Sequence, residues 1–299
     1  MPALKILITG GSGLLGQYLN TVLVKQNQIL TLYNQHPGNC KNYNSLQIDL
    51  TDYKKFNLLF AQFNPDVVVH TAAFTSPVIP DGVSTKEIYK INVNAALNIA
   101  RQCEKVGCKL IYLSTDLVYA GYRGSMLKED AKLIPASLYA ETKLVAEEKI
   151  KETFDNYIIL RTALMIGFGL NHSKCHFHQM YNNLKEGKRV KLFQDQYRTP
   201  LSLIDAARLM NEIIPLDIKS ETINFGGKTR ISRTELGELV CNITGFNKNL
   251  IDSVPLSSVT QIPQVADVSM NTDKLQSFGI TPLGIEEAVN ALLTDYNAG

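Results

Sequence analysis

The stretch LKILITGGSGLLGQYLN, residues 4–20, decides the fold of this chain. Its first part is a short apolar run that ends in glycine, as a buried β-strand does. Gly10, Gly13 and Gly16 follow at regular spacing, and an apolar pattern of helical period continues over residues 14–26. Glycines at a strand-to-helix turn allow a sharp bend, close approach of phosphate to the backbone and tight packing of helix on strand. We therefore predict a dinucleotide-binding turn, with the helix N-terminus facing the pyrophosphate.

Further apolar runs alternate with helical patterns along the chain. Strands are expected at residues 29–34, 46–50, 65–73, 109–121 and 157–167. Helices are expected at residues 52–63, 86–107 and 137–148. Continuous apolar strands that alternate with helices are typical of a parallel sheet covered on both faces, and right-handed crossovers make it doubly wound. We predict an α/β fold, a Rossmann-like doubly wound parallel sheet.

The pattern loosens after about residue 167. Short strand and helix signals, separated by Pro and Gly, continue to Pro282. We therefore predict an NAD(P)-binding Rossmann domain over residues 1–167. Residues 168–299 are expected to form mostly a smaller substrate-binding region, with some segments returning to the Rossmann core.

Composition and charge exclude several classes of protein. The net charge is +2 and no long basic run occurs, so nothing indicates nucleic acid or an anionic membrane. No apolar stretch approaches the roughly 18 residues of a membrane span. Five cysteines, an odd number without framework spacing, are typical of a reducing compartment. We expect a cytoplasmic protein.

Residues 172–178, HSKCHFH, mimic a zinc cluster through His172, Cys175, His176 and His178. A closed zinc site usually takes ligand pairs from two separated segments, and no second Cys/His pair accompanies this one. We expect no metal, and interpret the segment as a solvated or substrate-facing loop.

A second motif, SLYAETKLVAEE, occupies residues 137–148 and places Tyr139 and Lys143 four positions apart. Residues at i and i+4 share one face of a helix, so the phenol and the ammonium are expected together. The glutamates of the stretch are expected on a solvated face: Glu141, Glu147 and Glu148. Because this tyrosine–lysine spacing is common by chance, the motif alone leaves open whether it faces solvent or a ligand.

The end of the second expected strand lacks the acidic residue that usually binds the ribose 2′-hydroxyl of NAD. Asn34 lies there instead, so nothing repels the 2′-phosphate of NADP, although no arginine is present to bind it. The pattern slightly favours NADP(H) and leaves NAD(H) open. Asp49, at the end of the third strand, could accept a hydrogen bond from the adenine amino group, or cap the helix that starts near Asp52.

Together these motifs resemble the extended short-chain dehydrogenase/reductase superfamily, which combines TGxxGxxG, an LST strand end at Thr115 and the downstream YxxxK. Within it, LSTDLVYAG (113–121) and DQYRTP (195–200) resemble the dTDP-4-dehydrorhamnose reductase family of sugar-nucleotide reductases. RTALMIG (161–167) and MNTDKLQSFGI (270–280) do the same. The resemblance covers nearly the whole chain.

The resemblance implies catalytic roles for four residues. Tyr139 would give its phenolic proton to a carbonyl oxygen as hydride reaches the carbon. Lys143 would supply the positive charge that a phenol of pKa about 10 needs near neutrality. Thr115 would hydrogen-bond the carbonyl, and Asn92 would order a proton-relay water, unless it is an ordinary buried amide. The implied cofactor-binding residues are Gly10, Ser12, Gly13, Leu14, Leu15, Gly16, Asn34, Asp49, Leu50, Ala72, Ala73 and Thr75, with Tyr139 and Lys143.

On the substrate side, the resemblance implies contacts from Asp116, Leu164, Arg198 and Thr199. Arg198 could bind a diphosphate through paired donors. It could instead form a local salt bridge with Asp195 or Asp205.

Two departures from the family concern the sugar. Ala163–Leu164 stand where the family commonly has a tryptophan, and this chain has none. After AAFT the chain reads SPVIPDG (76–82), where the family has a Val-Asp and an Ala-Glu. We therefore expect a wider pocket that recognises the sugar ring loosely.

The implied activity is NAD(P)H-dependent reduction of a 4-keto group on a nucleotide-diphosphate sugar, most simply dTDP-4-dehydrorhamnose to dTDP-L-rhamnose. A dehydratase is disfavoured, because Leu117 stands where those enzymes often have glutamate. The alternatives are an epimerase of the same superfamily and a non-catalytic regulatory subunit, like that of methionine adenosyltransferase. Exposed helix faces in such folds often pair, which makes a homodimer the assembly to expect.

Overall fold

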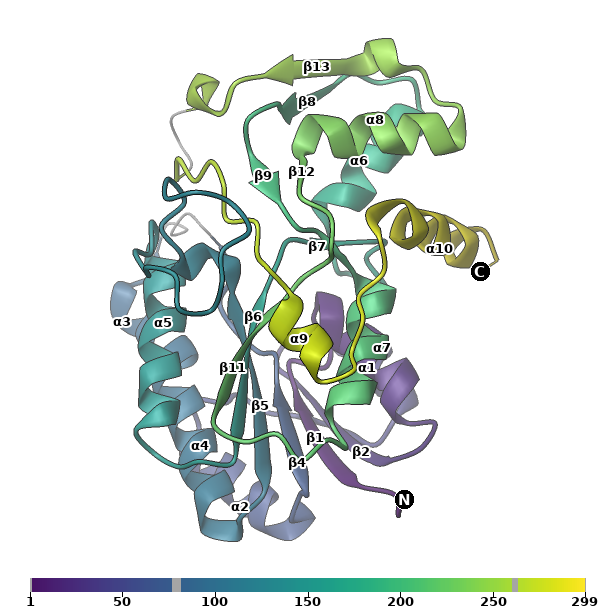
Figure 1. Cartoon of the computed structure of the whole chain (residues 1–299). Helices are drawn as coiled ribbons and strands as arrows, with labels where there is room; N and C mark the ends of the chain where they lie inside the picture. Colours follow the sequence, from purple (N-terminus) through teal and green to yellow (C-terminus); the bar gives the residue numbers. More distant parts are fainter. Residues whose placement is uncertain (1, 77–81, 260–262, 299) are drawn as a thin grey trace.

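A seven-stranded sheet forms the centre of the molecule (Figure 1). The computed structural model describes residues 2–76, 82–259 and 263–298. The sheet order is β11-β6-β5-β4-β1-β2-β3, and every pairing is parallel. Its strands are β1 (Lys5–Thr9), β2 (Gln28–Tyr33), β3 (Ser45–Gln47), β4 (Val67–His70), β5 (Lys109–Thr115), β6 (Tyr157–Thr162) and β11 (Glu221–Phe225). The predicted doubly wound parallel sheet is confirmed.

Helices cover both faces of the sheet. One face carries α1 (Leu14–Leu23) and α7 (Leu203–Ile213), and the other carries α2 (Tyr53–Phe63), α4 (Ala95–Val106) and α5 (Leu138–Lys151). Side chains of a strand point alternately to the two faces. Thus Ile6 and Ile8 join the core under α1 and α7, whereas Leu7 joins the core on the other side. The continuous apolar runs of the sequence reflect this burial on both faces.

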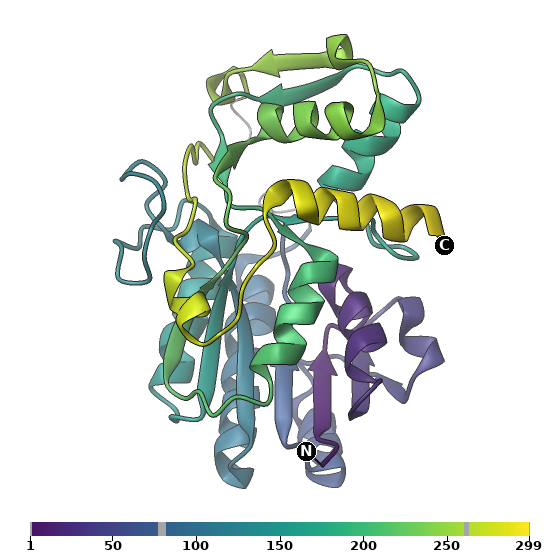
Figure 2. The ribbon, with the colours of Figure 1, turned by 45° about the vertical axis from the view of Figure 1, so that its right-hand side comes forward.

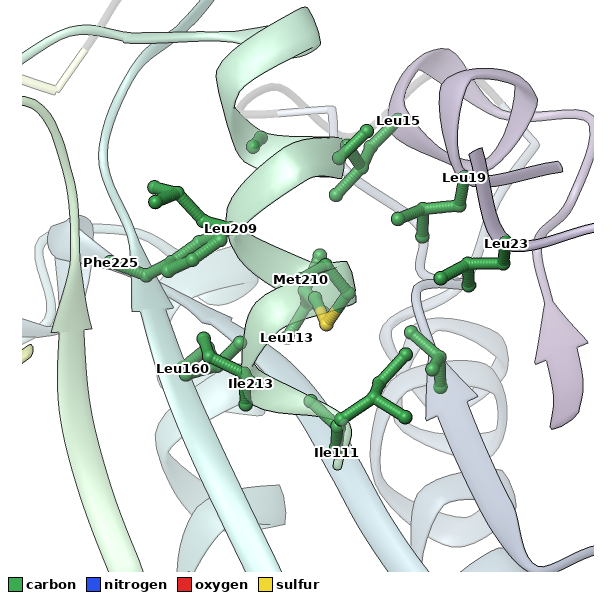
Figure 3. Packing of buried hydrophobic residues seen from close by; sticks show 14 of the residues in the cluster. Leu15, Leu19, Leu23, Ile111, Leu113, Leu160, Leu209, Met210, Ile213 and Phe225 are labelled. Carbon is green, nitrogen blue, oxygen red and sulfur yellow. The ribbon is translucent and has the colours of Figure 1, made fainter. Parts of the chain in front are cut away.

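The core under α1 and α7 draws on both halves of the chain (Figure 3). Figure 3 shows side chains of α1 and α7 meeting over the sheet strands: Leu15, Leu19, Leu23, Leu209, Met210, Ile213, Ile111, Leu113, Leu160 and Phe225. The helix α7 and the strand β11 both follow residue 167. The segment after residue 167 therefore completes the central sheet and one of its covering layers.

The remaining C-terminal elements form a smaller layer beyond the carboxyl ends of the sheet strands (Figure 2). Its strands form three short pairs: β7 (Met165–Ile166) with β10 (Leu201–Ser202), β8 (Val190–Phe193) with β13 (Ile251–Val254), and β9 (Tyr197–Arg198) with β12 (Ile231–Ser232). The helices of this layer are α6 (His176–Lys185), α8 (Arg233–Thr244) and α10 (Ile285–Ala298). The short helix α9 (Asp273–Ser277) lies instead beside β11, and its Leu275 joins the core under α1 and α7 (Figure 1). None of the helices in the described ranges combines the length and apolar character needed to cross a bilayer.

Several strands end earlier than the sequence pattern indicates. The expected strand 65–73 spans only Val67–His70, the strand 109–121 ends at Thr115, and the strand 157–167 ends at Thr162. The helix expected at residues 86–107 consists of α3 (Thr85–Tyr89), a π-helical turn (Lys90–Asn94) and α4. In each shortened strand the chain leaves the sheet at its carboxyl edge, so the leftover residues become loops at the site.

Candidate active site

The glycine turn between β1 and α1 brings two chain segments unusually close. Gly10 has a φ of +69°, and a Cβ there would lie 2.7 Å from the Ala72 backbone nitrogen. A Cβ on Gly16 would lie 2.2 Å from the Gly10 carbonyl oxygen. Side chains at either position would therefore push the turn, α1 and the end of β4 apart. These two glycines hold the shape that the sequence motif predicts.

The N-terminus of α1 is open towards an anion. Gly13 precedes the helix, with no side-chain cap and no acidic residue in the first turn. The helix dipole is positive there, and the first N–H groups lack partners within the helix. Ser12, Gly13 and Leu14 are partly or fully exposed at this turn, whereas Leu15 packs into the core, so Leu15 can offer a ligand only its backbone. The sheet order also reverses beside β1, where α/β folds place ligands.

The predicted cofactor-binding residues after β2 and β3 are largely exposed. Asn34 is exposed, and its carbonyl oxygen accepts a 2.7 Å hydrogen bond from the Gln47 side chain. Asp49 is exposed and accepts from the Thr51 backbone N–H. The cap of α2 is Asp52, whose carboxylate accepts from the Lys55 N–H, so the capping interpretation of Asp49 is wrong. Leu50 is half-buried against the core beneath α2.

A cleft of about 830 Å³ lies between the carboxyl edge of the sheet and the smaller layer. Of the predicted site residues, its walls include Leu14, Thr75, Thr115, Asp116, Tyr139, Leu164 and Arg198. Ala72 and Ala73 follow β4 at the same edge of the sheet. The structure thus brings two of the four predicted catalytic residues, Thr115 and Tyr139, to the wall of this cavity, whereas Asn92 and Lys143 are buried behind it. Of the SPVIPDG loop, residues 77–81 lie outside the described residues.

Tyr139 and Thr115 meet at the cleft. Thr115 ends β5 and Tyr139 lies in the first turn of α5, whose N-cap Ser137 accepts from the Ala140 N–H. Burial, and then the Asp116 carboxylate, raise the pKa of Tyr139 to about 12, against a hydrogen bond with Thr115 that lowers it. The phenol therefore holds its proton at neutral pH and can serve as a proton donor.

Lys143 is 2% exposed and follows Tyr139 by one helical turn. Its Nζ lies 4.0 Å from the centroid of the Tyr112 ring. Burial lowers the pKa of Lys143 to about 7, although the Glu147 carboxylate opposes that shift. The ammonium is therefore poised to lose its proton near neutrality, and a bound anion would favour the charged form.

We expect the free energy of unfolding to depend on pH through Lys143. The unfolded lysine keeps its proton up to about pH 10.5, whereas the folded one loses it near 7, so unfolding takes up a proton between these values. This contribution to stability therefore rises with pH, by at most about 1.4 kcal/mol per pH unit. Urea unfolding of wild type and Lys143→Met at several pH values between about 7 and 8 should give a difference that grows with pH. A difference that stays constant would contradict the lowered pKa.

A buried ionic network lies behind Lys143. Glu147, expected on a solvated face, is 0% exposed, so that expectation is wrong, while Glu141 and Glu148 are exposed as predicted. The Glu147 carboxylate accepts 3.2 and 2.8 Å bonds from Nε and Nη2 of Arg161, and a further bond from the Ser114 hydroxyl. Glu147 is buried because a charged partner from β6 meets it inside the protein.

Arg161 extends this network away from the cleft. Its Nη1 donates to the Tyr119 hydroxyl at 3.0 Å, and that hydroxyl donates to Asn224 Oδ1 at 2.7 Å. Asn224 belongs to β11, the strand that returns from the C-terminal half. The network therefore links α5, β5, β6 and β11 behind the catalytic face.

Asn92 lies in the π-helical turn and is 1% exposed. Its amide accepts from the Phe74 N–H at 2.7 Å and donates to the Phe74 carbonyl at 3.0 Å and to the Thr142 hydroxyl at 2.9 Å. Asn92 therefore fastens the segment after β4 to α5. These bonds fit an ordinary buried amide, and the relay role stays a prediction.

Asp116 and Arg198 lie together, but only loosely paired. Asp116 is 4% exposed, its Oδ2 has no hydrogen-bond partner, and the Arg198 Nε lies 3.7 Å from it. Burial raises the pKa of Asp116, and Arg198 opposes the rise. Arg198 pairs with neither Asp195 nor Asp205, whose carboxylates contact the Leu256 N–H and Arg208. Its neighbour Thr199 is fully buried and accepts from the Met270 N–H, so its side chain lies off the cleft walls.

The HSKCHFH segment is not assembled as a metal site. His176 lines the cleft, His178 accepts from the Gly169 N–H through Nδ1, and the His172 ring lies beside that of His36. Within residues 2–76, 82–259 and 263–298, no three His, Cys, Asp or Glu side chains are grouped to hold a metal ion.

Three residues of the site escaped the sequence analysis: Glu147, Arg161 and Arg233. Glu147 follows Lys143 by four positions, so helical spacing was a usable signal for its face. Arg161 lies in an otherwise apolar strand, where an arginine is seldom buried without a partner. Arg233, on the cleft wall at the start of α8, had no local signal.

The sheet, the glycine turn and the Thr115, Tyr139 and Lys143 arrangement define a Rossmann-fold protein of the extended short-chain dehydrogenase/reductase class. Known proteins agree with that class. The chain belongs to the family described as RmlD substrate binding domain, which matches residues 4–298. The resemblance to the dTDP-4-dehydrorhamnose reductase family is thereby confirmed.

Individual relatives are distant. The chain is 26% identical over 314 residues to methionine adenosyltransferase 2 subunit beta of Rattus norvegicus, covering 99% of this chain and 90% of the relative. It is 25% identical over 290 residues to dTDP-4-dehydrorhamnose reductase of Mycobacterium tuberculosis, covering 93% and 88%. Its structure is similar to that of dTDP-4-dehydrorhamnose reductase from Bacillus anthracis in complex with NADP, with a TM-score of 0.85, 22% identity, and coverage of 98% and 99%. This structural likeness shows the fold.

Proposed function

We propose that this protein is an NAD(P)H-dependent reductase of a 4-keto group on a nucleotide-diphosphate sugar. The first substrate to test is dTDP-4-dehydrorhamnose, which would give dTDP-L-rhamnose. The observation that carries the proposal is that Thr115 and Tyr139 line the same cleft, with Lys143 one turn along α5. The similarity to the Mycobacterium tuberculosis reductase supports the substrate class.

A dinucleotide fits the observed turn. The close approach at Gly10 and Gly16 leaves no side chain between the backbone and a pyrophosphate, and the N-terminus of α1 carries no cap of its own. Ser12, Gly13 and Leu14 would hold the pyrophosphate, while Asn34, Asp49 and Leu50 would contact the adenosine end. The backbone at Ala72 and Ala73, together with Thr75, would lie along the nicotinamide half of the cofactor. Bound there, reduced NADP or NAD would supply the hydride. The NADP complex of the Bacillus anthracis protein supports the fit.

Side chains of the protein would supply the proton that the reduction needs. Tyr139, protonated at neutral pH, would donate to the substrate carbonyl oxygen, and Thr115 would hold that oxygen in line. Lys143 would stabilise the phenolate that remains, since a cation nearby favours the charged form. Asp116 Oδ2 accepts no hydrogen bond from the described part of the protein and could accept one from a sugar hydroxyl, and Leu164 would lie against the apolar part of the sugar.

Cofactor choice should respond to Asn34. A carboxylate at this position would repel the 2′-phosphate of NADP and could accept from the 2′-hydroxyl of NAD. We expect wild type to bind NADPH at least as well as NADH, and Asn34→Asp to shift the ratio of Kd values towards NADH by about tenfold, or about 1.4 kcal/mol. Titration of both cofactors against both proteins measures this. A wild type that rejects NADPH would show that Asn34 does not govern the choice.

The activity is tested by NADPH and NADH consumption with a panel of 4-keto-6-deoxy sugar nucleotides. Reduction of at least one of them supports the proposal. Because Ala163–Leu164 replace the family's tryptophan beside the sugar, we expect that more than one of them is accepted. Product analysis, together with the amount of NAD(P)H consumed, separates reduction from epimerisation. An epimerase changes the sugar but leaves the cofactor's redox state unchanged after turnover.

A non-catalytic regulatory subunit is the second candidate. The similarity to methionine adenosyltransferase 2 subunit beta, over 99% of this chain, favours it. It predicts cofactor binding without consumption, and co-purification of a partner protein.

We further expect a homodimer acting in the cytoplasm. The absence of any disulfide among the five cysteines supports a reducing location, and sedimentation would measure the assembly.

A further inference from the structure

The cleft walls carry an excess of positive charge. Its basic lining residues are Lys174, His176, Arg189, Lys191, Arg198 and Arg233. Asp116 is the single carboxylate on the walls within the described part of the chain. Anionic groups on a ligand would balance this charge, and guanidinium groups suit phosphate because their planar donors match its oxygens.

Two of the three cleft arginines are already occupied within the protein. Arg189 places Nε 3.1 and 3.0 Å from the two carboxylate oxygens of Asp252. Arg198 donates Nη1 to the Tyr197 carbonyl at 2.6 Å and Nη2 to the Val265 carbonyl at 3.1 Å, with a longer bond to Ala266. Arg198 therefore holds the segment around Val265 and Ala266 against the cleft.

Arg233 is arranged differently. Its Nε donates to Gln196 Oε1 at 3.0 Å, which fixes the plane of the guanidinium. Among the described residues, its two η nitrogens have no hydrogen-bond partner and it forms no salt bridge. Arg233 lines the cleft and is half-buried. Arg233 is thus held in place by Gln196, and the N–H groups of its two η nitrogens can donate to a ligand in the cleft.

The surroundings of Arg233 within the protein are electrostatically unfavourable for its charge. It is the first residue of α8, at the positive end of the helix dipole. Burial, and then the neighbouring Arg198, lower the pKa of Arg233 to about 10, with Asp116 opposing the shift. An anion beside Arg233 would relieve both the burial and the repulsion.

We propose that Arg233 binds the diphosphate of the nucleotide-sugar substrate through its two η nitrogens, and that Arg198 positions the segment at Val265 and Ala266. The assignment rests on the proposed function, because the diphosphate belongs to the same substrate. It moves the phosphate contact from Arg198, where the sequence resemblance put it, to a residue on a different element.

The test measures binding of dTDP and of thymidine by calorimetry, without any turnover. Arg233→Met should weaken dTDP binding about 30-fold, equivalent to about 2 kcal/mol at about 1.4 kcal/mol per tenfold. Thymidine has no phosphate, so its affinity should stay within about threefold. The matched control is Arg230→Met, three residues away, since Arg230 pairs with Asp267 and does not line the cleft. It should bind dTDP within about threefold of wild type.

An Arg233→Met protein that binds dTDP as wild type does would overturn the assignment. If urea unfolding shows that Arg233→Met does not fold, Arg233→Lys is tested instead. It keeps the charge without the paired donors, and should weaken dTDP binding about tenfold; unchanged binding would again overturn the assignment. A wild type that binds neither dTDP nor UDP overturns it too. Arg233-dependent dTDP binding without reduction of any 4-keto sugar nucleotide supports this site and refutes the proposed reaction.

Discussion

Replacing Tyr139 with phenylalanine should lower turnover at least about a hundredfold, within the usual range for general acid catalysis. The change removes the phenolic hydroxyl and keeps the ring, so the cleft and the fold should be preserved. Because the pKa of Tyr139 is raised to about 12, the hydroxyl is protonated throughout the neutral range, and its loss removes a competent donor. The measurement is the steady-state rate with saturating NADPH and the best substrate of the panel.

Cofactor affinity serves as the internal check on this variant. NADPH binding by Tyr139→Phe should remain within about threefold, since the glycine turn and the N-terminus of α1 are untouched. Tyr122→Phe is a matched control, because Tyr122 is 70% exposed and does not line the cleft. Wild-type turnover in Tyr139→Phe would remove Tyr139 from the mechanism.

Breaking the pair between Glu147 and Arg161 should cost about 3–5 kcal/mol of unfolding free energy. Arg161→Met leaves the Glu147 carboxylate, which is 0% exposed, without its strongest partner. The double variant Glu147→Leu/Arg161→Met removes both charges, and should recover a large part of the loss, because paired apolar replacements are often neutral. Denaturant unfolding of the three proteins measures the effect.

The exposed pair Lys149–Glu152 on the same helix provides the contrast. Its side chains are 43% and 62% exposed, and such pairs contribute about 0–1 kcal/mol. Lys149→Met should therefore change the unfolding free energy by less than about 1 kcal/mol. An equally small effect of Arg161→Met would contradict the stabilising role of this buried pair.

The sequence allowed prediction of those features that depend on neighbouring residues. The strand, glycine turn and helix of residues 4–20 are adjacent in the chain, and the apolar runs reflect burial on both sheet faces. Tyr139 and Lys143 are one helical turn apart, so their shared face followed from spacing. The early ends of β4, β5 and β6 could not be predicted, because hydrophobic runs continue into the loops of the cleft.

The errors concern residues whose environment comes from distant parts of the chain. Glu147 resembles a surface glutamate until Arg161, 14 positions later, returns to it in β6. Arg233 meets Gln196, its partner at a separation of 37 positions, only after the short strands β9 and β12 have paired. Arg198 was predicted from its motif to contact phosphate, and that role stays a prediction; its bonds to backbone carbonyls of a segment almost 70 residues away could not be predicted from neighbouring residues.

The place of β11 at the edge of the sheet has a consequence for synthesis on the ribosome. β11 begins about 60 residues after its neighbour β6 ends, and α7, which covers the sheet beside α1, emerges in the same interval. At about 5–20 residues per second, a nascent chain waits roughly 3 to 12 s with β6 as an open edge. Such an edge can pair with another chain, so early folding is the stage at which this protein is most open to aggregation and to chaperone binding.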